Sequence, residues 1–209
     1  MEDREKRVKW IYTSKTNREL EERYDTWAKD YDNDLTAGFG YIAPKKAVDC
    51  FVKYVQKDAK ILDAGAGTGM VGELLARQGY KDIVAVDISK GMLEEAKKKN
   101  VYREFRQMVL GEHLDFPDDT FDAVISVGVL TYGHAPASSF DELVRITRPG
   151  GCIVFSLIPD VYENGGFKEK QESLVKDGKW KLVEVTDKFV PMPKGEPDVF
   201  HRDWIYQVV

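Results

Sequence analysis

Residues 61–70 read ILDAGAGTGM, and this stretch decides the fold of the 209-residue chain. Its apolar start predicts a buried strand, its three glycines at alternate positions predict a tight turn, and the apolar spacing from Met70 onward predicts a helix. A strand, a glycine turn and a helix in this order open a nucleotide-binding α/β unit. Because glycine has no Cβ atom, backbone N–H groups in the turn can approach a ligand closely. The first turn of the helix adds unpaired N–H donors and partial positive charge.

The glycine turn is compatible with two kinds of cofactor. Residues 67–72 read GTGMVG, which is a literal G-x-G-x-x-G dinucleotide motif. Asp63 argues against a dinucleotide, because a carboxylate at the end of the first strand would repel a pyrophosphate and attract a cation. S-adenosylmethionine (SAM) carries an ammonium and a sulfonium group and no phosphate. About twenty residues further on, a second predicted strand ends at Asp87, where a carboxylate can accept hydrogen bonds from both ribose hydroxyls.

Four segments resemble the motifs of one enzyme family. LDAGAGTG at 62–69 and VDIS at 86–89 resemble motifs I and II of the class I SAM-dependent methyltransferases. FPDDTFD at 116–122 and RPGG at 148–151 are similar to that family's segments before the fourth and fifth strands. The resemblance implies a Rossmann-like α/β fold. Its seven-stranded, mostly parallel sheet would have an antiparallel C-terminal strand and helices on both faces.

The resemblance also implies which residues hold SAM. Asp63 and the glycine loop would contact the methionine part, Asp87 the ribose, and a mostly apolar set the adenine. The full predicted set of cofactor contacts is Asp63, Ala64, Gly65, Gly67, Gly69, Asp87, Ile88, Met92, Leu110, Gly111, Glu112 and Val127. S-adenosylhomocysteine would be the product. No Cys, His or carboxylate cluster has the spacing of a metal site, so no metal is expected.

Leu110 departs from the common pattern of the family. Many relatives have an acidic residue there, which binds the adenine amino group, and leucine cannot accept that hydrogen bond. Glu112, a backbone carbonyl or water would then accept it, while Gly111 would contribute its backbone N–H. One group shares this leucine before glycine, and it also resembles the chain at 24–32, 43–50 and 121–128. It comprises the methyltransferase-like proteins of the Williams–Beuren syndrome chromosomal region, the twenty-seventh of that series.

The N-terminal part is expected to cover the site. We predict a charged, flexible lead-in at 1–16 and a single methyltransferase domain at 17–209, within which 17–42 would cover cofactor and substrate. The segment YDTWAKDYD at 24–32 is similar to the cover of many small-molecule methyltransferases. Trp27 or Tyr31 would border the cavity there, where an aromatic face attracts a sulfonium. The alternative is an amphipathic helix that only packs on the sheet.

Methyl transfer needs little catalytic machinery, because the sulfonium already activates the methyl group and the protein mainly positions the acceptor. A base is needed only when the acceptor holds its proton at neutral pH. His134 and Tyr132 are the candidates, since both follow the fourth strand at the ligand-binding edge of the sheet. A solvated loop histidine is the alternative for His134. His113 and His201 are weaker candidates.

Composition and absent motifs narrow the classes of molecule that could accept the methyl group. The formal net charge of −5 argues against a broad nucleic-acid surface, and the motifs of DNA and glutamine methylation are absent. A small-molecule acceptor is favoured. A protein acceptor reached with a partner, a SAM-binding protein without catalysis and an NAD(P)-dependent oxidoreductase are the alternatives. No signal peptide or apolar run long enough for a membrane span is visible, so we expect a cytoplasmic protein, with a nuclear location also open. Whether it is a monomer or a dimer stays open.

Periodicity predicts the other elements. Residues 36–41 would form a turn-prone loop. Helices are expected near 17–30, 44–56, 70–78, 90–99, 136–147 and 167–176, and strands near 60–64, 82–87, 104–109, 121–127, 152–157, 180–186 and 204–209.

Overall fold

Seven strands form one sheet in the computed structural model, which describes residues 2–209. The sheet order is β3-β2-β1-β4-β5-β7-β6, and only β7 runs against the other strands. The predicted mostly parallel sheet with an antiparallel C-terminal strand is confirmed. The strands are β1 Lys60–Ala64, β2 Asp82–Asp87, β3 Glu104–Gln107, β4 Phe121–Ser126, β5 Thr147–Leu157, β6 Trp180–Val185 and β7 Arg202–Val208.

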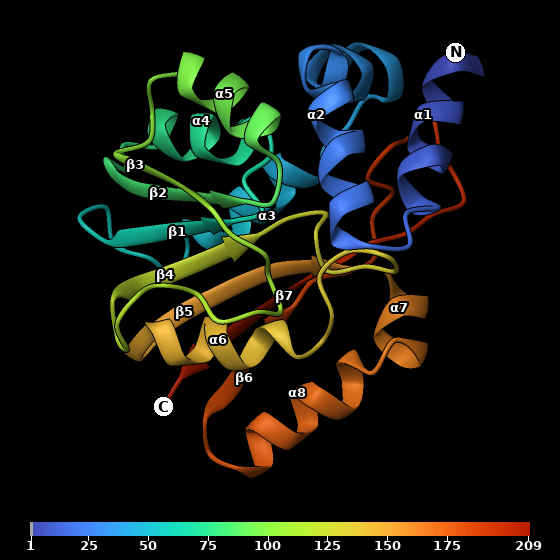
Figure 1. Ribbon diagram of the computed structural model, residues 1–209. Helices are drawn as coiled ribbons and strands as arrows, with labels where there is room; N and C mark the ends of the chain where they lie inside the picture. Colours follow the sequence, from blue (N-terminus) through green and yellow to red (C-terminus); the bar gives the residue numbers. More distant parts are fainter. Residues whose placement is uncertain (1) are drawn as a thin grey trace.

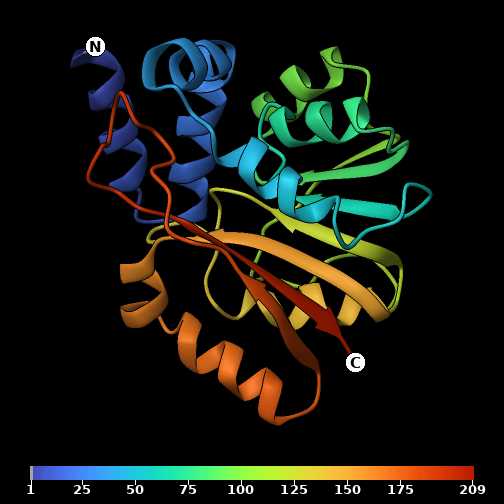
Figure 2. The ribbon, with the colours of Figure 1, turned by 180° about the vertical axis from the view of Figure 1, so that it is seen from behind.

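Helices cover both faces of this sheet, as the sequence predicted. In Figure 1, α4 and α5 lie on one side of the strands and α6 and α8 on the other; Figure 2 shows the same arrangement from behind. The helices are α1 Glu2–Tyr12, α2 Asn17–Asn33, the π-helix η1 Asp34–Phe39, α3 Ala43–Phe51, α4 Met70–Arg77, α5 Lys90–Lys98, α6 Ser139–Ile146, α7 Pro159–Asn164 and α8 Phe167–Lys176.

Strand alternation divides the core between the two faces. Ile61 belongs to a buried cluster with residues of α3 and α4, whereas its neighbour Leu62 belongs to a cluster with residues of α6 and α8. Because successive side chains of a strand point to opposite faces, a central parallel strand must be apolar at nearly every position. The near-continuous apolar runs of β1 and β4 follow from this.

The N-terminal segment forms a helix that the sequence did not predict. The lead-in expected to be flexible forms α1, whose Val8 and Ile11 are buried. Two arginines of α1 bind one buried carboxylate: Arg4 Nε lies 2.8 Å from Asp34 Oδ1, and Arg7 lies 2.9 Å from Asp34 Oδ2. These tertiary contacts, rather than the local apolar content, hold the segment.

Other boundaries also needed correction. Residues 34–39, expected to be partly a loop, extend α2 as a π-helix that is capped by Gly40, where φ is +67°. Helix α3 ends at Phe51 rather than near residue 56, and α7 was not predicted. None of the described helices combines the length and apolar character needed to cross a bilayer.

Candidate functional site

A cavity opens at the carboxyl ends of β1, β2 and β4 and is also lined by residues of α2. Figure 1 shows α2 beside this edge of the sheet. The space between the walls of the cavity measures about 650 Å³, a volume that includes space open to solvent. Nine of the predicted residues line it: Tyr31, Gly65, Gly67, Asp87, Ile88, Met92, Leu110, Val127 and His134. The predicted edge of the sheet is therefore where the cavity lies.

The glycine loop forms the floor of the cavity. Gly65 and Gly67 have backbone φ angles of +81° and +54°, which residues other than glycine rarely adopt. A Cβ atom on Gly65 would lie 2.2 Å from Val129 Cγ2, so close packing excludes a side chain there. A Cβ atom on Gly67 would have no atom within 4 Å. The backbone at Gly67 therefore faces open space, where a ligand can approach it.

Asp87 joins the glycine loop to the end of β2. Its Oδ2 accepts a hydrogen bond from Gly67 N at 2.8 Å, and its Oδ1 accepts one from Ser89 N at 2.8 Å. Burial raises the pKa of Asp87 to about 6, against the lowering effect of these N–H groups. A carboxylate has about four acceptor positions, so Asp87 can still accept hydrogen bonds from a ligand in the cavity.

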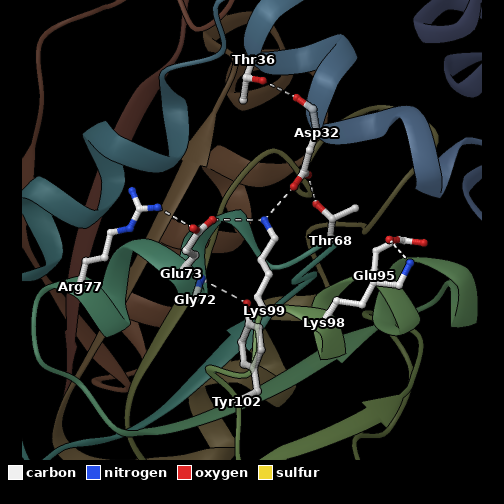
Figure 3. Close-up of polar contacts among 10 residues, drawn as sticks. All are labelled: Asp32, Thr36, Thr68, Gly72, Glu73, Arg77, Glu95, Lys98, Lys99 and Tyr102. Carbon is white, nitrogen blue, oxygen red and sulfur yellow. Dashed lines mark hydrogen bonds and ion pairs between the residues drawn. The ribbon is translucent and has the colours of Figure 1, made fainter.

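Asp63 lies behind the loop and does not line the cavity. Its Oδ2 accepts a hydrogen bond from Tyr102 Oη at 2.6 Å, and its buried Oδ1 has no partner among the described residues. Burial raises the pKa of Asp63 to about 7. Figure 3 shows Tyr102 turned toward Gly72 of α4, whose N–H it accepts at 3.1 Å. A direct contact between Asp63 and a ligand stays a prediction, without support from this geometry.

Ala64 and Gly69, two further predicted contacts near the loop, lie behind the cavity wall. Ala64 is fully buried, and its carbonyl accepts a hydrogen bond from Ser126 Oγ at 2.8 Å. Gly69 caps α4 with φ of +86°. Neither is among the residues that line the cavity, so each shapes the loop from behind.

The predicted adenine end is apolar. Ile88, Met92 and Leu110 line it, and Met108 and Val109 complete the wall. The other two predicted contacts do not line it: a Cβ on Gly111 would meet Pro136 at 2.7 Å, and Glu112 is exposed. Leu110 therefore lines the cavity with an apolar side chain, whereas Gly111 and Glu112 do not line it.

Helix α2 covers the cavity through one face. Tyr24 and Tyr31, seven residues apart, both line it, and the indole of Trp27 lies 4.7 Å from the Tyr31 ring, measured between centroids. Trp27 itself lies on the other side, where its Nε1 donates to Asp34 Oδ2 at 2.9 Å. Tyr24 was not predicted as a site residue, although its spacing from Trp27 and Tyr31 was visible.

Two aspartates of α2 attach this covering helix to the segments that surround the cavity. Asp25 Oδ1 accepts hydrogen bonds from Ser89 Oγ at 2.6 Å and from Gly91 N at 2.7 Å, at the start of α5. Asp32 binds Lys99 Nζ at 2.7 Å and also contacts Thr68 of the glycine loop (Figure 3). The cover is therefore tied to the loop and to the helix that follows β2.

His134 is half-buried, and its ring packs edge-on against Tyr24. Its Nδ1 lies 3.0 Å from the Tyr132 carbonyl oxygen, which can only accept, so Nδ1 carries the proton. Its Nε2, 2.8 Å from Tyr24 Oη, then accepts the tyrosine proton in a hydrogen bond. Burial lowers the pKa of His134. Tyr132 is exposed, points to Asp160 at 3.1 Å and does not line the cavity.

Sequence reasoning missed several lining residues. Their types carry no chemical signal, and only the fold brings them together. They are Asn17, Leu20, Tyr24, Met108, Val109, Gly128, Val129 and Ala135. Within residues 2–209, no group of three or more His, Cys, Asp or Glu side chains is placed to hold a metal ion.

Comparison with known proteins agrees with this geometry. Residues 62–155 match the family described as "Methyltransferase domain". The human methyltransferase-like protein 27 is 42% identical over 134 residues, which cover 62% of this chain and 54% of that protein. The demethylmenaquinone methyltransferase of Clavibacter sepedonicus is 41% identical over 98 residues, covering 46% of this chain and 39% of that protein. The chain thus spans about half the length, or less, of these two relatives.

Solved structures share the whole fold. A possible histamine N-methyltransferase of Thermotoga maritima, described as SAM-dependent, has a TM-score of 0.64 at 17% identity, covering 88% of this chain and 97% of that one. The chain therefore has the class I SAM-dependent methyltransferase fold, and residues 62–155 match the methyltransferase domain in sequence. A [4+2]-cyclase, SpnF, superposes with a TM-score of 0.72 at 14% identity over 93% of this chain and 97% of that one. Since that protein is a cyclase by name, the class I methyltransferase fold alone does not fix the reaction.

Proposed function

We propose that this chain binds SAM in the cavity at the carboxyl ends of β1, β2 and β4 and transfers its methyl group to a small molecule. One observation carries the proposal: an open glycine backbone at Gly67 and a carboxylate at Asp87 line a single cavity, joined by a 2.8 Å hydrogen bond. Among the described residues that line the cavity there is no Lys or Arg. A dinucleotide pyrophosphate would meet only backbone N–H donors there and no side-chain cation.

The lining supports a position for each part of SAM. Asp87 would accept hydrogen bonds from the ribose hydroxyls, and the Gly67 backbone would lie against the methionine part. Ile88, Met92 and Leu110 would pack on the adenine, which burial in an apolar slot stabilises. The sulfonium would then lie near Tyr31 and Gly128, close to the aromatic face of α2.

Bound SAM supplies a methyl group already activated by the sulfonium. The chain's part is to hold the acceptor in line with that methyl and to exclude water. If the acceptor is a hydroxyl, its proton would pass to Tyr24 Oη while the tyrosine proton passes to His134 Nε2, along the 2.8 Å hydrogen bond. The candidate base His134 therefore would act through Tyr24. Tyr132, turned to Asp160, has no such route.

A small-molecule acceptor is supported by the relatives. Besides demethylmenaquinone methyltransferases, they include a ubiquinone biosynthesis O-methyltransferase of Alkalilimnicola ehrlichii. Among the described residues, no contact favours a protein acceptor reached with a partner, or a SAM-binding protein without catalysis.

Titration calorimetry of the purified chain with SAM and with NADH tests the cofactor. SAM should bind and NADH should not. Gly67→Ala should weaken SAM binding at least about tenfold, because its methyl group would enter the space the ligand needs. Gly178→Ala is the matched control: Gly178 also has a positive φ, +67°, and open surroundings, but lies far from the cavity between α8 and β6. NADH binding, or equal SAM affinity in both variants, would overturn the proposal.

Turnover needs a separate measurement. The chain should convert SAM to S-adenosylhomocysteine in a metabolite extract, and one metabolite should gain the mass of a CH₂ group. Persistent SAM binding with no labelled methyl transferred from SAM to any extract component would favour the non-catalytic alternative.

A further inference from the structure

A second chamber adjoins the cofactor cavity on the far side of Tyr24 and Tyr31. It lies between α1, α2, the loop after β4 and the segment before β7, and encloses about 620 Å³, part of it open to solvent. Tyr24, Tyr31 and Gly128 line both spaces. A molecule in the chamber would therefore meet the cofactor cavity at these three residues.

The walls of this chamber carry no charge. Among the described residues that line it there is no Lys, Arg, Asp or Glu. Its four tyrosines stay protonated at neutral pH, because tyrosine ordinarily titrates near 10 and burial raises the pKa values of Tyr24, Tyr31 and Tyr41 well above that value. An ionised ligand would lose its hydration there without gaining a counter-charge, which is costly.

One side chain in the wall of the chamber has a polar atom without a hydrogen-bond partner. His201 is only 8% exposed, lines the chamber and has a buried Nδ1 with no hydrogen-bond partner in residues 2–209. Burial lowers the pKa of His201 to about 4, so the ring is neutral. A buried polar atom without a partner destabilises a protein, and a ligand that bonds to it would remove that cost.

We propose that this chamber binds the methyl acceptor, and that the acceptor is an uncharged molecule with an apolar, ring-sized body and a hydroxyl or carbonyl group that pairs with His201. The apolar side chains of α1 and Met192 would hold the body. The end to be methylated would lie at Tyr24, beside the cofactor cavity. This inference rests on the proposed function, because it assigns the acceptor of that reaction.

A series of naphthalene compounds tests the charge preference. 2-Naphthol, 2-naphthoate and 2-naphthylmethylammonium share one ring system and differ in charge at pH 7.5. Calorimetry with and without saturating SAM should show 2-naphthol binding at least about tenfold more tightly than either ion. Equal or tighter binding of an ion, or no binding of 2-naphthol to the SAM-bound chain, would overturn the proposal.

Variants locate the binding site. Wild-type protein should prefer 2-naphthol over unsubstituted naphthalene, and His201→Leu should lose that preference while keeping its SAM affinity. His113→Leu is the control, because His113 is exposed beside Glu142 and remote from the chamber. An unchanged preference in His201→Leu would remove His201 from the site. Ile158→Trp, which would fill the chamber, should abolish 2-naphthol binding.

The two proposals fail in distinguishable ways. SAM binding without 2-naphthol binding would reject only the acceptor chamber. Binding of 2-naphthol by a chain that does not bind SAM would reject the proposed function and leave a neutral ligand site.

Discussion

At the scale of single residues, Asp87 is a titratable group of the cavity whose charge should make SAM affinity depend on pH. Its pKa is raised to about 6 by burial, so the carboxylate begins to bind a proton just below neutrality. Ribose hydroxyls donate to the ionised form. SAM affinity should therefore fall as the pH drops through 6, by about tenfold between pH 7.5 and pH 5. Calorimetry over this range measures the effect.

The Asp87→Asn variant tests whether Asp87, rather than another buried carboxylate, causes this pH dependence. The variant should bind SAM more weakly at pH 7.5, by roughly 1.5–3 kcal/mol, and its affinity should no longer fall below pH 6. Asp63→Asn is the control, because the pKa of Asp63 is also raised, to about 7, but its side chain lies outside the cavity. A pH profile in Asp87→Asn equal to that of the wild type would contradict the assignment.

Asp63 also shows what residue-level reasoning could and could not predict. The motif correctly placed a carboxylate at the end of β1, but strand alternation puts its side chain on the face of Ile61, which packs against α4. That face could have been deduced from the sequence. The partner could not, because Tyr102 is 39 residues away and meets Asp63 only in the folded chain.

At the scale of elements, α2 is the cover whose anchoring should govern ligand release. Asp25→Ala removes two hydrogen bonds, from Ser89 Oγ and Gly91 N, that hold the helix to the start of α5. Their loss should weaken docking of α2 by roughly 1–3 kcal/mol. SAM should then dissociate faster, and amides of α2 should exchange hydrogen faster. Stopped-flow and hydrogen-exchange measurements test both effects.

Glu22→Ala is the matched control for this prediction. Glu22 lies on the same helix but pairs only within it, with the exposed Arg18 at 3.0 Å, and such surface pairs contribute little. Its SAM dissociation rate should match that of the wild type. A normally folded Asp25→Ala protein that releases SAM at the wild-type rate would show that α2 does not gate the cavity.

Element prediction succeeded where periodicity was strong and failed where tertiary contacts decide. Helices α2, α4 and α5 appear where apolar spacing and caps predicted them, with Ser89 capping α5 through Met92 N at 3.0 Å. All seven strands appear near their predicted places, but β5 begins at Thr147 rather than near residue 152, so it includes the predicted turn at 148–151. Helix α1 was missed because its few apolar residues give a weak pattern. Its order depends on Asp34, which the chain brings to it only after folding.

At the scale of the whole molecule, the sheet was predictable because both faces of its central strands are buried. The cover and the cavity wall were not, since they depend on distant pairs such as Tyr24 and His134, 110 residues apart. No local pattern in the sequence specifies such a contact.

The sheet also contains a buried carboxylate that should make global stability depend on pH. Asp203 of β7 is 1% exposed, and neither of its carboxylate oxygens has a hydrogen-bond partner in the described chain. Burial raises the pKa of Asp203 to about 7, against a lowering effect of Lys46. The folded state therefore keeps this proton at pH values where the unfolded chain has lost it. This contribution to stability should decline as the pH rises from about 4 to 7 and then level off.

Asp203→Asn should remove that decline, because the amide cannot ionise. Urea unfolding at pH 5 and pH 8 measures the free energy of unfolding of variant and wild type. Between the two pH values, the difference should shift in favour of the variant by roughly 1–3 kcal/mol. Asp58→Asn, at an exposed position, should show no such shift. An equal difference at both pH values would mean that Asp203 is paired or solvated in solution, because a carboxylate titrates between pH 5 and pH 8 only when burial without a partner raises its pKa.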